Sequence, residues 1–190
     1  VTDSNIISNY HYKEPPNELL NNKSKIIVYS GTLANWVDYD LLLKCAEELP
    51  DFKILLIGYI HALAPKILVD RLIQHQRVIS VGYKDYKELP NYYQNSSIGI
   101  IPYQSNNEHI KYSTPTKFLD YFASGLPVVT TDYPAAHEMK DLADIAIDQE
   151  DFIKKIRFTD LDSKKAKEYS QRRIDFAKNN TWSKQTSKMV

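Results

Sequence analysis

Residues 26–31 read Ile26-Ile27-Val28-Tyr29-Ser30-Gly31, a short apolar run that ends at a glycine. The same kind of run recurs five more times along the chain, the last of them weaker than the others. Short continuous apolar runs are typical of strands that are buried on both faces, as in a parallel sheet. The six predicted strands are 26–30, 54–57, 78–81, 97–101, 127–131 and 143–147.

Segments with helical periodicity lie between these runs. In residues 39–49, for example, apolar residues recur on one face while Glu47 and Glu48 lie opposite. Because strand and helix alternate, we expect βαβ units with right-handed crossovers. The sequence therefore predicts an α/β fold with a doubly wound parallel β-sheet. The predicted helices are 39–49, 64–75, 87–94, 116–124, 151–158 and 163–178.

The length and the composition limit the alternatives. A chain of 190 residues suits one domain, and we expect residues 25–190 to form it with a helical tail, after a polar lead-in at 1–24. With 24 basic and 24 acidic residues the net charge is zero, which argues against a general nucleic-acid binder. No apolar run approaches the ~20 residues of a transmembrane helix.

Cysteine and histidine usage argues against a metal centre. Cys45 is the only cysteine, so a disulfide framework and a multi-cysteine site are excluded, and a reducing compartment is compatible with this usage. The five histidines show no paired spacing. We expect a cytoplasmic protein without a metal ion.

Three of the five glycines end predicted strands, at Gly31, Gly58 and Gly82. Ligands of open α/β sheets bind beyond the carboxyl ends of the strands, where glycine lets the backbone turn or approach a ligand. The glycines are also compatible with simple turns. Neither a G-x-G-x-x-G fingerprint nor a G-x-x-x-x-G-K-[ST] loop is present, which argues against a standard dinucleotide or P-loop site.

The segment before the helix at 116–124 carries the clearest chemistry. Ser113 or Thr114 can cap a helix that opens with Pro115. The free amides of Thr116 and Lys117, together with the lysine side chain, then form an anion site. Asp120, one turn further on, can accept hydrogen bonds from a diol such as a ribose. The alternative interpretation is a well-capped helix with a solvated Lys and Asp.

Three stretches resemble the C-terminal, nucleotide-sugar-binding half of a retaining GT-B glycosyltransferase of family 4 (glycosyl transferases group 1). They occur in the family's order and span most of the chain. The stretches are Val28-Tyr29-Ser30-Gly31-Thr32-Leu33 with Trp36-Val37-Asp38, then Val81-Gly82-Tyr83-Lys84, and Ser113-Thr114-Pro115-Thr116-Lys117-Phe118-Leu119-Asp120-Tyr121 running into Ala123-Ser124-Gly125-Leu126-Pro127-Val128-Val129.

The resemblance implies a Rossmann-like sheet of strand order 3-2-1-4-5-6 and a nucleoside-diphosphate sugar as donor. It places the base near Gly82, Tyr83 and Lys84, and the ribose at Asp120. The diphosphate would lie at the start of the helix opened by Pro115, where Gly31 and Thr32 let the first loop come close. No metal or cofactor is implied, because helix termini and basic side chains offset the charge of the leaving diphosphate.

The resemblance also implies a missing partner domain. Residues 1–24 would lead in from an N-terminal acceptor domain, without which this donor half is inactive. The complete protein would be a hexosyltransferase of bacterial polysaccharide biosynthesis that retains the anomeric configuration, and its peripheral association with a membrane stays open.

The sequence departs from the family at three places, one of which is Asp120, whose side chain is one methylene shorter than the Glu of many members. Tyr112 stands where many members carry a Glu, and Thr32 and 37–38 stand where they carry an Arg and a Lys that clamp the diphosphate. Lys117 is therefore the main candidate for phosphate contact and catalysis, with Lys111 and His109 as weaker candidates, and Glu108 is a candidate substitute for the missing carboxylate.

These departures leave other functions open. A degenerate, non-catalytic module that binds a sugar, a nucleotide or a partner is one alternative, and a nucleotide-sugar 2-epimerase is another. For the enzyme, we expect the largest functional cleft at the carboxyl ends of the strands, lined by Gly31, Thr32, Tyr83, Thr114 and Lys117.

Overall fold

A six-stranded parallel sheet forms the centre of the structure, a computed structural model that describes residues 14–111 and 116–180. Its strand order is β3-β2-β1-β4-β5-β6, which confirms the predicted fold class and order. The strands are β1 (Lys25–Ser30), β2 (Phe52–Ile57), β3 (Val78–Ser80), β4 (Ile98–Ile101), β5 (Val128–Thr131) and β6 (Asp144–Ala146).

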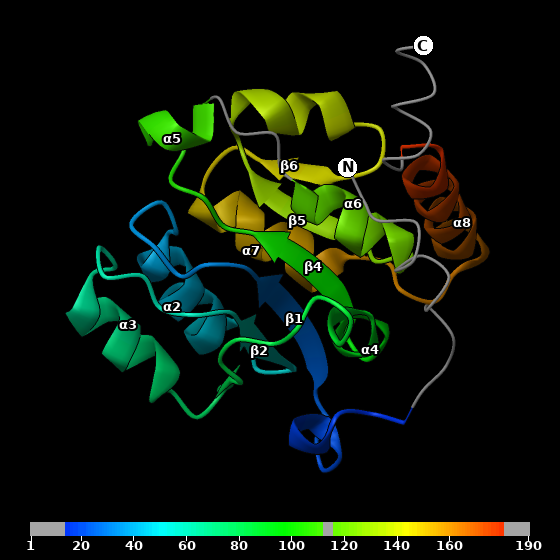
Figure 1. The fold of residues 1–190 in the computed structure, drawn as a ribbon. Helices are drawn as coiled ribbons and strands as arrows, with labels where there is room; N and C mark the ends of the chain where they lie inside the picture. The colour runs from blue at the N-terminus through cyan, green and yellow to red at the C-terminus, as the bar shows by residue number, and fades with distance from the viewer. Residues whose placement is uncertain (1–13, 112–115, 181–190) are drawn as a thin grey trace.

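Helices cover both faces of the sheet (Figure 1). One face carries α2 (Tyr39–Glu48), α3 (Lys66–Ile73) and α7 (Gln149–Phe158), and the other carries α4 (Leu89–Gln94), α6 (Thr116–Ala123) and α8 (Lys164–Asn179). The 3-10 turns η1 (Asn17–Leu19) and η2 (Pro134–Met139) and the short helix α5 (Glu108–Lys111) complete the described elements.

The observed elements match the predicted ones to within about two residues at most ends. The helix α5 was not predicted, because its four residues are too few to produce a periodic signal. The α6 helix is described from Thr116 onward, so the predicted opening at Pro115 and the caps at Ser113 and Thr114 lie outside the described residues, as does Tyr112.

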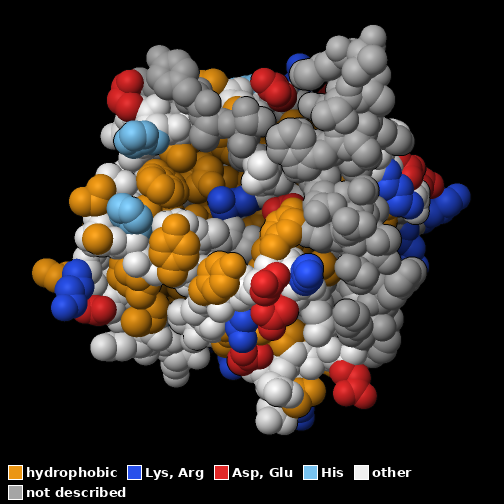
Figure 2. All heavy atoms as spheres, viewed as in Figure 1, with side chains coloured by type: hydrophobic (Ala, Val, Ile, Leu, Met, Phe, Trp, Pro, Cys, Tyr) orange, Lys and Arg blue, Asp and Glu red, His pale blue; other side chains and the backbone are white. Residues whose placement is uncertain are grey.

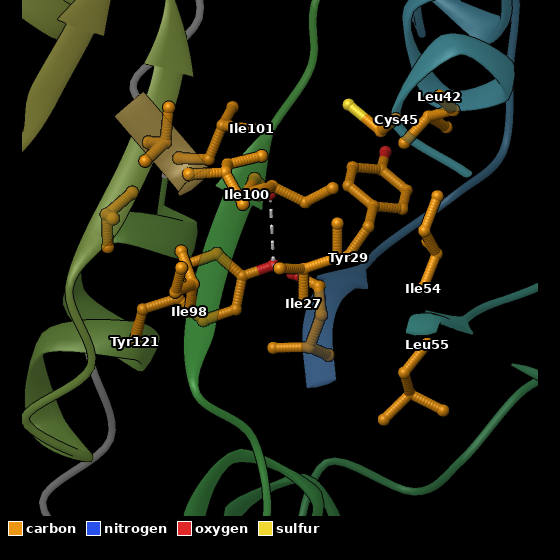
Figure 3. Packing of buried hydrophobic residues seen from close by; sticks show 14 of the residues in the cluster. Ile27, Tyr29, Leu42, Cys45, Ile54, Leu55, Ile98, Ile100, Ile101 and Tyr121 are labelled. Carbon is orange, nitrogen blue, oxygen red and sulfur yellow. Dashed lines mark hydrogen bonds between the residues drawn. The ribbon is translucent and has the colours of Figure 1, made fainter. Parts of the chain in front are cut away.

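The core is centred on β1, the third strand of the sheet. Ile27, Val28 and Tyr29 have no exposed surface, because helices cover β1 on both sides. Figure 3 shows Tyr29 beside Leu42 and Cys45 of α2. An unbroken apolar run is therefore what this position requires.

The first described residues pack against the domain. Leu19 of η1 is buried in the core, and the carboxylate of Glu18 lies 2.6 Å from the ammonium of Lys84. Within the described ranges, no helix is long and apolar enough to cross a membrane. The expectation that residues 1–24 connect to another domain stays a prediction.

Candidate functional site

The loops that follow β1, β2 and β3 meet at the glycines that end these strands. The Gly31 amide donates to the carbonyl of Ile57, at 2.7 Å, and the Gly58 amide donates to the carbonyl of Gly82, at 2.8 Å. A Cβ on Gly58 would lie 2.1 Å from the carbonyl oxygen of Gly31, and Gly58 has a φ of +144°. Only glycine allows this approach, so the glycines join the three loops into one surface, here called the carboxyl edge.

Lys117 reaches this surface from the first turn of α6. A Cβ on Gly31, whose φ is +143°, would lie 2.7 Å from the Lys117 ammonium nitrogen. The same nitrogen lies 5.7 Å from the ring centre of Tyr29 and 5.6 Å from that of Tyr103, which is within cation–π range. The missing side chain at Gly31 thus makes room for a cation at the ends of β1 and β4.

Asp120, one turn further along α6, is a buried carboxylate. Its side chain is 7% exposed, and its Oδ1 accepts a hydrogen bond of 2.5 Å from the Tyr86 hydroxyl. Burial raises the pKa of Asp120 from 3.8 to about 6, although the Tyr86 bond and the charge of Lys117 act in the opposite direction. A buried acid with a raised pKa is more common at functional sites than elsewhere.

A buried hydrogen-bond network fixes α6 relative to β1. The Tyr121 hydroxyl accepts from the Ser30 amide at 3.0 Å and lies 3.2 Å from the carbonyl of Val28, to which it donates. The Ser30 hydroxyl lies 2.7 Å from that of Tyr93. Figure 3 shows Tyr121 reaching from α6 across β4 toward β1, a path that Gly99 permits because a Cβ there would lie 2.6 Å from the ring. These hydrogen bonds therefore hold in place the helix that carries Lys117 and Asp120.

Apolar side chains are exposed on the same loops. Tyr59, Ile60 and Leu63 follow β2, and Tyr83 follows β3 with 69% of its surface exposed. Figure 2 shows hydrophobic side chains with histidines among them on this face. The ring of Trp36 lies 6.4 Å from that of His61 and 6.5 Å from that of His109. An exposed apolar surface of this kind is typical of a binding region.

The structure also places four of the other predicted site residues. Thr32 lies at the carboxyl edge, where its carbonyl accepts from the Tyr29 hydroxyl at 2.9 Å. Gly82, with a φ of +67°, has open space around it. Thr116 is the exposed first residue of α6, and Glu108 is the exposed first residue of α5.

Lys84 is engaged elsewhere. Its ammonium binds Glu18 and lies 5.5 Å from the ring centre of Tyr92. The pKa of Lys84 is raised mainly by the Glu18 hydrogen bond. The predicted contact of Lys84 with the substrate stays a prediction.

Two residues of the site were not predicted from the sequence. Tyr86 and Tyr103 contact Asp120 and Lys117 respectively, from loops 34 and 14 positions away along the chain. The only local signal was the position of each residue shortly after a predicted strand. Contacts across such separations depend on the tertiary fold.

One cavity among the described residues lies at the opposite edge of the sheet. It has a volume of about 720 Å³ and opens between α7 and α8 beside Pro127 and Asp144, where β5 and β6 begin. The expectation that the largest functional cleft lies at the carboxyl ends stays a prediction. At that edge Lys117 packs over Tyr29 and Tyr103.

Comparison with known proteins places the chain in a family. Residues 12–175 match the family model of Glycosyl transferases group 1. The chain is 28% identical over 129 residues to TuaH of Bacillus subtilis (strain 168), a protein named for teichuronic acid biosynthesis and glycosyl transfer, and the match covers 66% of this chain and 32% of TuaH.

Solved structures share the fold. A glycosyltransferase from Rickettsia africae ESF-5 superposes with a TM-score of 0.73 at 18% identity, covering 94% of this chain and 51% of that one. Anabaena Alr3699/HepE in complex with UDP gives 0.71 at 14% identity, with coverages of 94% and 51%. The C-terminal domain of the group 1 glycosyl transferase LpcC from Francisella tularensis gives 0.67 at 16% identity, with coverages of 95% and 98%.

The coverages describe how the chain relates to these proteins. It spans about a third of TuaH and about half of the Rickettsia and Anabaena chains, but nearly all of the LpcC domain. The family match extends over most of the chain, from before β1 into α8. The chain belongs to the family Glycosyl transferases group 1.

Proposed function

We propose that the carboxyl edge binds a nucleoside-diphosphate sugar, and that this chain is the donor-binding half of an enzyme that transfers the sugar with retention. The observation that carries this proposal is the placement of Lys117 at Gly31, with Asp120 one turn further along the same helix. A cation and a buried carboxylate three residues apart project from neighbouring positions of one helix. They suit a diphosphate and a ribose respectively.

The diphosphate is assigned to Lys117. Gly31 exposes backbone beside the ammonium, and the first turn of α6 adds the positive end of a helix dipole. When the bond between the sugar carbon and the diphosphate oxygen breaks, the electron pair leaves with the diphosphate. A cation held at this position stabilises that charge as it develops.

The ribose and the base are assigned to Asp120 and Tyr83. The Asp120 carboxylate can accept hydrogen bonds from the two ribose hydroxyls, and the exposed ring of Tyr83, beside Gly82, can stack on the base. Anabaena HepE, which shares the fold, was solved in complex with UDP. By analogy UDP is the first nucleotide to test.

The acceptor side of the reaction is assigned to a domain outside this chain. The exposed apolar surface on the loops of the carboxyl edge supports such a partner, and so does coverage of about half of the Rickettsia and Anabaena chains. In that arrangement the acceptor oxygen forms the new bond to the sugar, and its proton leaves with the diphosphate. The similarity to TuaH favours a bacterial polysaccharide as the product.

Glu108 keeps its proposed role as a carboxylate facing the sugar. It lies on α5, whose neighbour His109 contacts Trp36, and α5 follows Tyr103, which contacts Lys117. The predicted contacts of Ser113, Thr114 and Pro115 with the diphosphate stay proposals.

Calorimetric titration of the chain with UDP, GDP, ADP and the matching nucleosides tests the proposal. We expect one diphosphate to bind more tightly than its nucleoside, and no sugar transfer by the chain alone. Arg172→Ala on α8 is the control, because it lies by the cavity at the opposite edge. Binding of no nucleotide would contradict the proposal and favour a non-catalytic module.

A further inference from the structure

The loop between β3 and α4 contacts the α6 helix through one buried hydrogen bond. The hydroxyl of Tyr86, a residue with 38% of its surface exposed, donates to Oδ1 of Asp120 at 2.5 Å. Asp120 itself is almost completely buried. In this structure a surface tyrosine therefore supplies a donor to a carboxylate that water hardly reaches.

The loop backbone around Tyr86 is held by its own hydrogen bonds. The amide of Asp85 donates to Glu88 Oε2 at 2.9 Å, and the amide of Lys87 donates to Asp85 Oδ1 at 3.1 Å. Lys84 is also held by Glu18. These bonds fix the backbone on both sides of Tyr86, so displacing its hydroxyl from Asp120 would take rotation of the side chain.

A ribose diol would need the same carboxylate. Two neighbouring hydroxyls engage a carboxylate best with one bond to each oxygen, and Oδ1 of Asp120 already accepts from Tyr86. A fully solvated carboxylate can accept about four hydrogen bonds. The burial of Asp120 restricts the directions from which donors can approach, so a ribose and the phenol meet at the same oxygen.

We propose that Tyr86 competes with the ribose diol for Asp120, so that a ribonucleotide must displace the phenol from the carboxylate before both of its hydroxyls can bind there. The inference rests on the proposed function, because it assumes that a nucleotide binds at Asp120. A ligand without these hydroxyls leaves the Tyr86–Asp120 bond in place and gains nothing from the carboxylate. The loop between β3 and α4 thereby lowers the affinity for ribonucleotides and narrows their advantage over deoxy analogues.

Tyr86→Phe removes the competing hydroxyl and keeps the ring. The unliganded protein then has a carboxylate that lacks this donor, so the diol has one bond fewer to displace. We expect UDP to bind roughly three- to tenfold more tightly to Tyr86→Phe than to the wild type, a change of about one hydrogen bond. The affinity for 2′,3′-dideoxy-UDP should not change.

Calorimetry at pH 8, where Asp120 is ionised, measures these affinities for UDP, GDP and ADP and for their 2′,3′-dideoxy analogues. The matched control is Tyr169→Phe, the same change on α8 beside the cavity at the opposite edge. Unchanged or weaker ribonucleotide binding by Tyr86→Phe would overturn the competition while leaving the proposed function in place. If the wild type binds none of the six nucleotides, the proposed function fails, and the competition fails with it.

A second measurement needs no nucleotide. NMR titration of the Asp120 carboxyl carbon follows its pKa directly, and loss of the Tyr86 donor should raise that pKa in Tyr86→Phe relative to the wild type. Identical titration curves would show that the contact does not form in solution, which would also overturn the proposal.

Discussion

The two edges of the sheet differ in how their charged groups are held and in the cavity found there. At the carboxyl edge, glycines at positive φ, a cation and a buried acid converge on one surface. At the amino edge the cavity of about 720 Å³ is lined by many charged groups that have local partners. Lys155 pairs with Asp151 at 2.8 Å, Arg173 donates to the Leu142 carbonyl, and Arg172 lies over Tyr169.

The comparison shows that volume alone is a poor guide to a functional site. The cavity at the amino edge also holds charges with shifted pKa values: hydrogen bonds lower the pKa of Asp151 and Asp160, and burial lowers that of Arg173. Close approach of loops and burial of a carboxylate both cost folding free energy. Proteins retain such features mainly where function requires them. The carboxyl edge has these features.

The largest expected effect is at the glycines. We expect Gly58→Ala to reduce the free energy of unfolding by about 3 kcal/mol or more, because its Cβ would meet the Gly31 backbone at a positive φ. Gly82→Ala is the control, since it has a positive φ but open space, and should cost only about 1–2 kcal/mol. Urea denaturation measures both, and equal losses would show that the two loops do not touch.

Asp120→Asn should stabilise the fold at high pH. The folded-state pKa of about 6 lies above the usual 3.8, so the native state binds more protons than the unfolded state between these values. The stability of the wild type therefore falls as the pH rises through this window. We expect the variant to be more stable by about 1–3 kcal/mol at pH 8 and equally stable below about pH 4. A difference that does not depend on pH, measured by denaturation at both values, would contradict the buried charge.

At the amino edge, Arg173→Met should affect stability only. Arg173 is 8% exposed and its Nε donates to the Leu142 carbonyl at 2.9 Å, so its loss leaves a buried acceptor without this partner. We expect a loss of about 1–2 kcal/mol by denaturation and unchanged nucleotide affinity by calorimetry. Weakened nucleotide binding would show that the amino edge also contributes to nucleotide binding, which would contradict the comparison.

The smallest effect concerns Lys84. Lys84→Met breaks an ion pair with Glu18 near the surface, so the change in unfolding free energy should stay below about 1 kcal/mol. Because Glu18 already holds the Lys84 ammonium, diphosphate affinity should also be unchanged, with Glu18→Gln as the matched variant. If Lys84→Met weakens diphosphate binding while Glu18→Gln does not, Lys84 contacts the substrate as the sequence predicted.

The sequence predicted the sheet well because its signals are local. Six apolar runs, three of them ending at glycines, suffice to place strands, and the family resemblance supplied their order. The meeting of Gly31 and Lys117 could also be predicted, because the carboxyl ends of parallel strands share one edge. The contact of Tyr86 with Asp120 could not, since nothing in the spacing of two residues 34 positions apart specifies which side chain fills a buried gap. The engagement of Lys84 by Glu18 was missed for the same reason.

The central claim is that Lys117 and Asp120 act together on a nucleoside diphosphate, and one calorimetric experiment tests it directly. Wild type, Lys117→Ala and Asp120→Ala are titrated with uridine, UMP and UDP. We expect Lys117→Ala to weaken UDP about tenfold to a hundredfold with little effect on uridine, and Asp120→Ala to weaken all three ligands by a similar factor. Equal weakening of uridine and UDP by Lys117→Ala, or no effect of Asp120→Ala, would contradict the account.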